Sequence, residues 1–221
     1  MCHGCYADVT AVAADPHILS AARQAIERHG WRDATLERIA DEAGLSRMTL
    51  HRRGVTREAV LDGLAQAFEA EYRGAMWPAL TSPGTARERL EQALAALCDV
   101  CDANLGLLAA LGESVRWGIF HDAESAGADS SMPIAAAPSS HRAKGPAGVL
   151  TRSVFTEPVE RILRDGAADG SLRGVEDPAE TATVLYNPVS HTYRHLRRGH
   201  GWPPERARRG VLELALDGVS A

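Results

Sequence analysis

Four arginines and no acidic residue lie in the short stretch from residue 46 to residue 57. They are Arg47, Arg52, Arg53 and Arg57. Positive charge concentrated on one short element suits the phosphate backbone of a nucleic acid, because each ion pair with a phosphate releases a condensed counterion. A solvated basic helix in an ordinary helical domain is the alternative interpretation of this stretch alone.

Neighbouring side chains carry groups that can contact the edges of bases. Arg47, Met48, Thr49 and His51 are expected where a major groove can be reached, and His51 can also donate to a phosphate. The candidate DNA-contacting residues are therefore Thr35, Ser46, Arg47, Met48, Thr49, His51, Arg52, Arg53 and Arg57.

Two short helices are expected to hold these side chains. Apolar residues at helical spacing predict a first amphipathic helix that contains Leu36, Ile39, Ala40 and Ala43. Thr35 can cap its start, and Gly44 can end it, since glycine adopts a left-handed backbone at little cost. Ser46 can cap a second helix that covers roughly residues 47–53. Two short helices joined by a glycine-containing turn form a helix-turn-helix.

The same region resembles the tetracycline-repressor (TetR) type of bacterial regulator over about 45 residues. The segments that carry the resemblance are Ile18-Leu19-Ser20-Ala21-Ala22, His29-Gly30-Trp31, Ala34-Thr35-Leu36, Ile39 through Ser46, Thr49-Leu50-His51-Arg52, and Thr56-Arg57-Glu58-Ala59-Val60. This chain departs from the family pattern at three places. His51 stands where the family usually has Tyr, Gly54-Val55 where it has Phe-Pro, and Arg57 where it has Lys.

The resemblance implies an all-α protein, with an N-terminal three-helix helix-turn-helix DNA-binding domain followed by a helical ligand-binding and dimerisation domain. We place a flexible arm at residues 1–15, the DNA-binding domain at 16–60, and the effector-binding and dimerisation domain at 61–221. The implied function is control of transcription, most often repression, by a homodimer that binds double-stranded operator DNA and a small-molecule effector. A dimer suits a palindromic site because two recognition helices about 34 Å apart can enter successive major grooves.

Composition agrees with a helical protein that is not a general nucleic-acid coat. The chain has 221 residues, 45% of them hydrophobic and only 5% aromatic, and its net charge is −5. Ala and Leu dominate the apolar residues, which favours helices over sheets. No apolar run is long enough to span a membrane and the start lacks the pattern of a signal peptide, so we expect a cytoplasmic protein with no membrane partner.

Further helices are predicted along the rest of the chain, at residues 57–73, 86–102, 147–168, 179–198 and 205–218, with one or two more between 104 and 120. Gly30 is expected to end the first helix, and Gly74 with Trp77-Pro78 the helix that starts at Arg57. Residues 122–146 are rich in Ala, Ser, Gly and Pro, which predicts a long loop that is either a lid or disordered. In the resembled family the last two helices pack against those of a second copy.

A small, largely apolar effector is expected among the central helices. The candidate ligand-binding residues are Trp117, Phe120, Phe155, Tyr186 and His191. Their aromatic rings lie near broken or kinked segments, where cavities are easiest to keep. Simple core packing is the alternative interpretation of the same aromatics.

Two Cys-x-x-Cys pairs, Cys2/Cys5 and Cys98/Cys101, allow an alternative function as a metal- or thiol-redox-responsive regulator. The gap between the pairs is far longer than the about 15–20 residues of known zinc spacings. Cys98 and Cys101 also fall on an apolar stripe, which fits buried thiols. We therefore expect no metal and no cofactor, and we interpret His191 and His195, four residues apart, as ordinary residues of a helix face. Because no Ser-His-Asp framework, phosphate loop or His-Glu-x-x-His motif occurs, we do not expect an enzyme.

Overall fold

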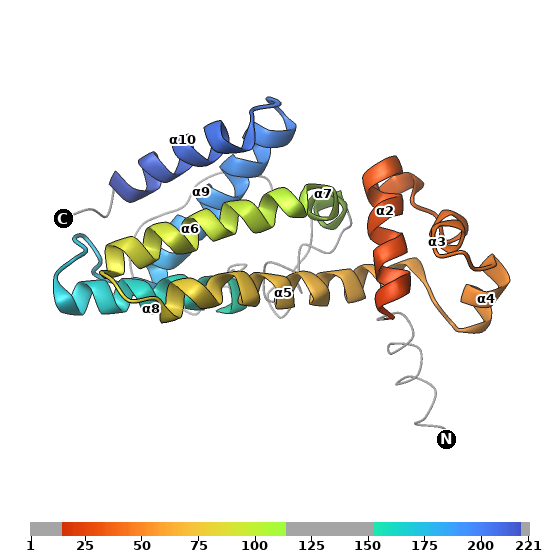
Figure 1. Ribbon diagram of the computed structural model, residues 1–221, viewed down its shortest axis with the longest axis horizontal. Helices are drawn as coiled ribbons and strands as arrows, with labels where there is room; N and C mark the ends of the chain where they lie inside the picture. The colour runs from red at the N-terminus through yellow and green to blue at the C-terminus, as the bar shows by residue number, and fades with distance from the viewer. Residues whose placement is uncertain (1–14, 114–152, 218–221) are drawn as a thin grey trace, which may run out of the picture.

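The computed structural model describes residues 15–113 and 153–217, and every regular element in these ranges is a helix (Figure 1). The helices are α2 (Pro16–Asp33), α3 (Leu36–Glu42), α4 (Arg47–Arg52), α5 (Arg57–Thr81), α6 (Ala86–Ala103), α7 (Leu105–Glu113), α8 (Ser153–Asp169), α9 (Pro178–Arg198) and α10 (Pro204–Asp217). The predicted arm, the predicted loop at 122–146, Trp117, Phe120 and the Cys2/Cys5 pair lie outside the described residues.

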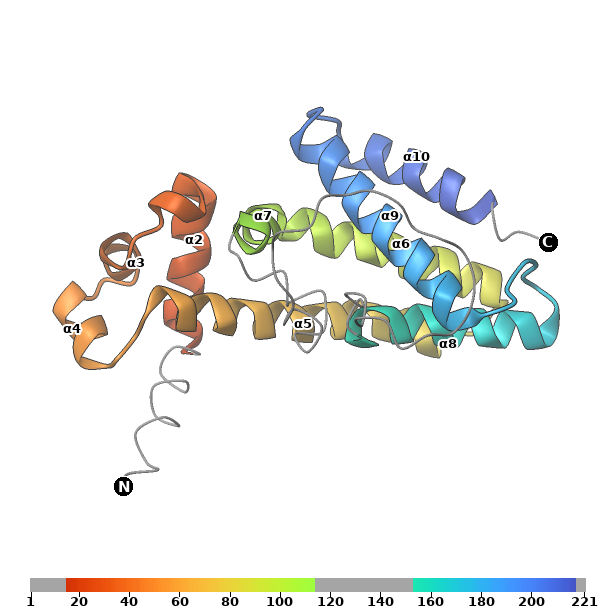
Figure 2. The same cartoon turned by 180° about the vertical axis from the view of Figure 1, so that it is seen from behind.

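The molecule has two parts joined by one long helix. α2, α3 and α4 form a small unit at one end, and α5 runs from this unit along the larger helical part (Figures 1 and 2). α6 and α8 pack against α5, α9 packs against α6 and α8, and α10 lies on α9 and α6. α7 leaves this bundle and packs against α2, so the two parts touch at a second place besides α5.

The prediction for the end of the first long helix of the larger part is wrong. α5 does not stop near Gly74 but continues to Thr81, with Pro78 inside its last turns. Burial explains the continuation, because Met76 and Ala79 extend the buried stripe beyond Gly74 and keep the chain against the core. The first helix does break at Gly30, where φ is 73°, but a further helical turn then carries it to Asp33.

Side-chain caps begin two helices of the larger part, α6 and α9. The Thr85 hydroxyl accepts from the backbone N–H of Glu88, and the Glu88 carboxylate accepts from the backbone N–H of Thr85, which together form a capping box. Asp177 caps α9 by accepting from two backbone N–H groups.

Within residues 15–113 and 153–217, no single helix is long and apolar enough to cross a membrane. α6 and α7 taken together have the length and composition, but the two helices are bent by 79° at the break between them.

Candidate functional site

The helix-turn-helix consists of α3 and α4, and a hydroxyl cap begins each helix. The Thr35 hydroxyl accepts from the N–H of Arg38 at 3.3 Å, and the Ser46 hydroxyl accepts from the N–H of Thr49 at 3.0 Å. Gly44 lies between them with a φ of 61°, in the left-handed region that favours glycine. These caps and this turn agree with the predicted positions and set the angle between the two helices.

Buried side chains hold α4 against the rest of the unit. Leu50 is fully buried, and Val55 is nearly so, which fills core space where the family usually has a proline. His17 of α2 adds a contact that the sequence did not indicate, since its Nε2 lies 2.8 Å from the carbonyl oxygen of Ala43 at the end of α3. No local pattern could have shown this contact, because it joins residues 26 positions apart.

Five candidate DNA-contacting side chains are exposed along α4 and the residue after it. They are Arg47, Met48, His51, Arg52 and Arg53. Met48 is 71% exposed, although a side chain of this kind is usually buried. The Ser46 and Thr49 hydroxyls lie 2.8 Å apart and contact each other at the start of the helix. α4 lies at the far end of the molecule (Figure 1), and together with Arg53 it carries three exposed guanidinium groups, an imidazole and a thioether.

Arg57 and Thr35, the candidate residues outside α4 and its two caps, already make contacts within the protein. A Nη2 group of Arg57 donates to the carbonyl oxygen of Trp31, and its guanidinium carbon lies 4.2 Å from the centroid of the Trp31 ring. This cation–π contact attaches the start of α5 to the end of α2. Thr35 is exposed at the start of α3, where its hydroxyl serves as the helix cap.

A polar network joins the helix-turn-helix unit to the larger part. Asn104, only 2% exposed, lies at the bend between α6 and α7. Its Oδ1 accepts from Arg23 of α2 at 2.7 Å, and its Nδ2 donates to Glu71 of α5 at 3.1 Å and to the carbonyl oxygen of Val100 at 2.9 Å. Arg23 also pairs with Glu71 at 3.4 Å. Local sequence patterns do not indicate this network, because its residues lie on α2, on α5 and at the end of α6.

Two of the predicted effector residues lie together in the core. The rings of Phe155 and Tyr186 are stacked with their centroids 5.7 Å apart, and Tyr72 packs edge-on against both. The Tyr72 hydroxyl donates to the carbonyl oxygen of Phe155 at 2.6 Å, and burial raises the pKa of Tyr72 and of Tyr186. His191 and Tyr186 both line a cavity of about 10 Å³, which is room for about one water molecule.

The Cys98 and Cys101 thiols are buried in α6. Burial raises the pKa of Cys101 to about 12 and raises that of Cys98 as well. Thiols are metal ligands and nucleophiles only as thiolates, so this environment disfavours both roles. In the described part of the chain, no group of three or more His, Cys, Asp or Glu side chains is placed to hold a metal ion.

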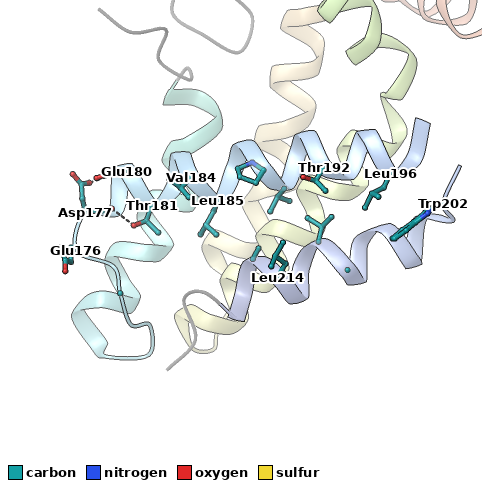
Figure 3. A pocket seen from close by; sticks show the side chains of 16 residues that line it. Glu176, Asp177, Glu180, Thr181, Val184, Leu185, Thr192, Leu196, Trp202 and Leu214 are labelled. Carbon is teal, nitrogen blue, oxygen red and sulfur yellow. Dashed lines mark hydrogen bonds between the residues drawn. The ribbon is translucent and has the colours of Figure 1, made fainter. Parts of the chain in front are cut away.

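A groove of about 760 Å³ lies between α9 and α10 (Figure 3). Val184 and Leu214 line it and are 60% and 80% exposed. Glu176, Asp177 and Glu180 lie at one end, where α9 begins, and Trp202 lies at the other. An apolar surface of this size on a folded chain is typical of a protein–protein interface.

Comparisons with known proteins identify the small unit. Residues 18–63 match the family model described as bacterial regulatory proteins of the tetR family. This range contains α3, α4 and both hydroxyl caps, so the chain is a helix-turn-helix DNA-binding regulator. Residues 18–63 form the DNA-binding domain of the TetR family of bacterial regulatory proteins, whose members act by binding DNA and are not enzymes.

Solved structures share the fold of the whole chain. A structure described as the molecular basis for control of antibiotic production by bacterial hormones has a TM-score of 0.64 and 19% identity, covering 93% of this chain and 96% of that one. A TetR/AcrR-family regulator from Thermobifida fusca has a TM-score of 0.61 and 18% identity, with coverages of 91% and 95%. The fatty acid degradation regulator FadR from Bacillus halodurans has a TM-score of 0.64 and 14% identity, with coverages of 90% and 93%. No curated protein sequence matches the chain.

Proposed function

We propose that this TetR-family regulator is a cytoplasmic repressor that binds a palindromic operator as a homodimer and is released by a small, largely apolar effector. The observation that carries the proposal is the exposed face of α4, with Arg47, Arg52 and His51 beside the exposed Met48. Arginine suits both phosphates and the edge of guanine, whereas an apolar side chain suits base edges alone.

Each candidate residue has a proposed role. Arg47, Met48 and His51 contact base edges, while Arg52 and Arg53 pair with phosphates on either side of the groove. Thr35 and Ser46 donate from their hydroxyls to phosphates at the two helix starts, and Thr49 stands beside Ser46. Arg57 stabilises the helix-turn-helix unit through its contact with Trp31, and its remaining N–H groups contact a phosphate.

The effector site is proposed in the core of the larger part, with residues 61–221 as the effector-binding and dimerisation domain. Phe155 and Tyr186 belong to the aromatic core, Tyr186 and His191 line the small cavity, and Trp117 and Phe120 are proposed to complete the site. An apolar effector fits because the rings are buried and their stacking can open around a flat or aliphatic molecule. Proteins of similar fold include a fatty acid degradation regulator and a ketosteroid transcriptional regulator, which supports this class of effector.

The groove between α9 and α10 is the proposed dimer interface. Exposed Val184 and Leu214 supply its apolar centre, and a two-fold axis would place the same groove of a second copy against it. The acidic end of α9 and the arginine-rich start of α10 lie at opposite ends of the groove, so an antiparallel pair of copies brings opposite charges together.

Two contacts are proposed to carry the effector signal to α4. α5 spans the boundary between the proposed domains at residues 16–60 and 61–221. The network of Arg23, Asn104 and Glu71 ties α2 to the same helix and to the bend before α7. A rearrangement of the aromatic core that tilts α5 would therefore change the separation of the two recognition helices, and both half-sites would lose affinity together.

The decisive experiment is an effector titration with and without operator. The operator is first selected from a randomised DNA pool with the purified protein, and palmitate and a ketosteroid are the first probes. By linkage, an effector that releases the operator must bind the DNA-bound protein more weakly by the same factor. Equal effector affinities in the two titrations would reduce the function to DNA binding without regulation, and no selected sequence at all would contradict the DNA-binding proposal.

A further inference from the structure

Two exposed histidines converge where α9 turns into α10. His195 lies in the last turn of α9, and His200 lies in the loop that follows. Their Nε2 atoms are 3.1 Å apart, their ring centroids are 4.8 Å apart, and the ring planes are inclined by 84°. The pair differs from His191 and His195, which are four residues apart on α9.

The separation of the ring centroids shows that the two rings do not meet in a straight N–H···N hydrogen bond. In a straight N–H···N hydrogen bond of the same length, the centroids would be about 5.4 Å apart, since each ring nitrogen lies about 1.15 Å from its centroid. Two imidazoles can bind one ion in neighbouring positions of tetragonal coordination, each about 2.1 Å from it with an angle of about 95° at the metal. Their centroids are then about 4.8 Å apart. The observed 4.8 Å agrees with two nitrogens directed at one point.

The turn is built to hold the two rings in this position. A Cβ atom on Gly199 would lie 2.8 Å from the carbonyl oxygen of His195 and 3.2 Å from its ring atoms Cε1 and Nδ1, so a side chain here would displace the ring. The same carbonyl oxygen accepts from the N–H of Gly199 at 2.7 Å. On the other side, His200 packs edge-on against Trp202, and Arg206 lies 4.0 Å over the Trp202 ring.

We propose that His195 and His200 form a two-histidine chelate for one divalent transition-metal ion, with water in the remaining coordination positions. Imidazole nitrogen suits Ni²⁺, Cu²⁺ and Zn²⁺. The described residues place no third His, Cys, Asp or Glu side chain in this cluster, so the ion is exchangeable rather than a permanent part of the fold. The bound ion joins the last turn of α9 to the loop that carries Trp202, a residue of the α9–α10 groove.

Ni²⁺ titration calorimetry on the full chain, without a histidine tag, tests the site. Cys2→Ser, His3→Ala and Cys5→Ser are present in every protein, because those side chains can bind the same ion. We expect one Ni²⁺ per chain, and an affinity lower by at least about tenfold in His195→Ala and in His200→Ala, since even outer ligands contribute that much. His191→Ala, on the same helix, is the matched control and should bind as the parent does.

Two further measurements distinguish a preorganised metal site from adventitious binding of Ni²⁺. Gly199→Ala keeps both imidazoles but displaces the His195 ring, so it should also lower the Ni²⁺ affinity. Ni²⁺ should raise the melting temperature of the parent and of His191→Ala, but not that of the two histidine variants. Equal affinity in the parent and both histidine variants, a loss in only one of them, or an unchanged Gly199→Ala protein would overturn the chelate.

Discussion

Met48 is an exposed apolar side chain on α4, and attraction to phosphates does not explain its exposure. It is 71% exposed among arginines, and an apolar group contributes nothing to phosphate binding. The apolar group that the major groove offers is the C5-methyl of thymine. We therefore predict that replacing thymines of the selected operator by uracil, one at a time, lowers affinity at one position in each half-site by about 1 kcal/mol, or about fivefold.

Fluorescence anisotropy with wild-type protein and Met48→Ala separates this contact from a general effect of uracil. The variant should bind the thymine and uracil operators equally, because the methyl group then has no apolar neighbour. If wild-type protein tolerates uracil at every position, Met48 does not contact a thymine methyl.

Arg52 belongs to the electrostatic part of the interface. Arg52→Ala should weaken binding to all sequences alike and reduce the slope of log affinity against log salt by about 0.9, the share of one phosphate contact. The control is Arg161→Ala, which removes an exposed arginine of α8 far from α4. The assignment of α4 as the recognition helix fails if Arg47→Ala, Arg52→Ala and Arg53→Ala combined leave operator binding at the wild-type level.

At the scale of elements, Asn104 holds three helices together through one buried amide. Asn104→Ala removes the buried amide, which is 2% exposed, from between the Arg23 guanidinium and the Glu71 carboxylate, whose side chains are 29% and 38% exposed, and leaves the carbonyl oxygen of Val100 without this donor. We predict a loss of about 1–3 kcal/mol in the free energy of unfolding, measured by urea denaturation. Gln24→Ala, which removes an exposed amide next to Arg23, should be close to neutral. Equal loss in both variants would show that the network contributes nothing specific.

Packing between α6 and α8 depends on a glycine. A Cβ atom on Gly166 would lie 2.9 Å from the Cβ of Ala86 and would also meet the side chain of Leu172. Gly166→Ala should therefore destabilise the protein by about 1–3 kcal/mol through overpacking. The matched change is Gly74→Ala in α5, where a Cβ meets nothing within 4 Å; there the substitution should stabilise by up to about 1 kcal/mol through helix propensity. Thermal melting of the two variants in opposite directions is the expected result.

At the scale of the whole molecule, the apolar groove predicts a dimer. Leu214 is 80% exposed at its centre, and Leu214→Glu would place a carboxylate in an interface core. We expect the dimer dissociation constant to rise by about 30-fold or more, equivalent to about 2 kcal/mol. Sedimentation measures the change, and operator affinity should fall with it because the two half-sites are no longer bound together.

Trp77→Glu is the control for the dimer, since Trp77 is also a large exposed side chain, at 63%, but lies on α5 outside the groove. It should leave the dimer unchanged. A protein that is monomeric before any substitution, or a Leu214→Glu variant that dimerises as the wild type does, would exclude this groove as the interface.

The sequence by itself determined the helical class, the helix-turn-helix and the family. Each of these depends on residues a few positions apart: a hydroxyl at Thr35 or Ser46 caps its own helix, and the turn between those helices needs Gly44. Such signals act through local hydrogen bonds and backbone torsion angles, so they can be recognised without knowledge of the rest of the chain.

Tertiary structure alone decided the rest. α5 passes Pro78 because burial of Met76 and Ala79 outweighs the local preference to stop. The contact of Arg23 with Asn104 joins residues 81 positions apart, and the α9–α10 groove exists only once two helices have packed. Even His195 and His200, close in sequence, converge only because the turn at Gly199 directs both rings to one point. Periodicity identifies which face of a helix is buried, but the neighbour that covers the face is set by packing of the whole chain.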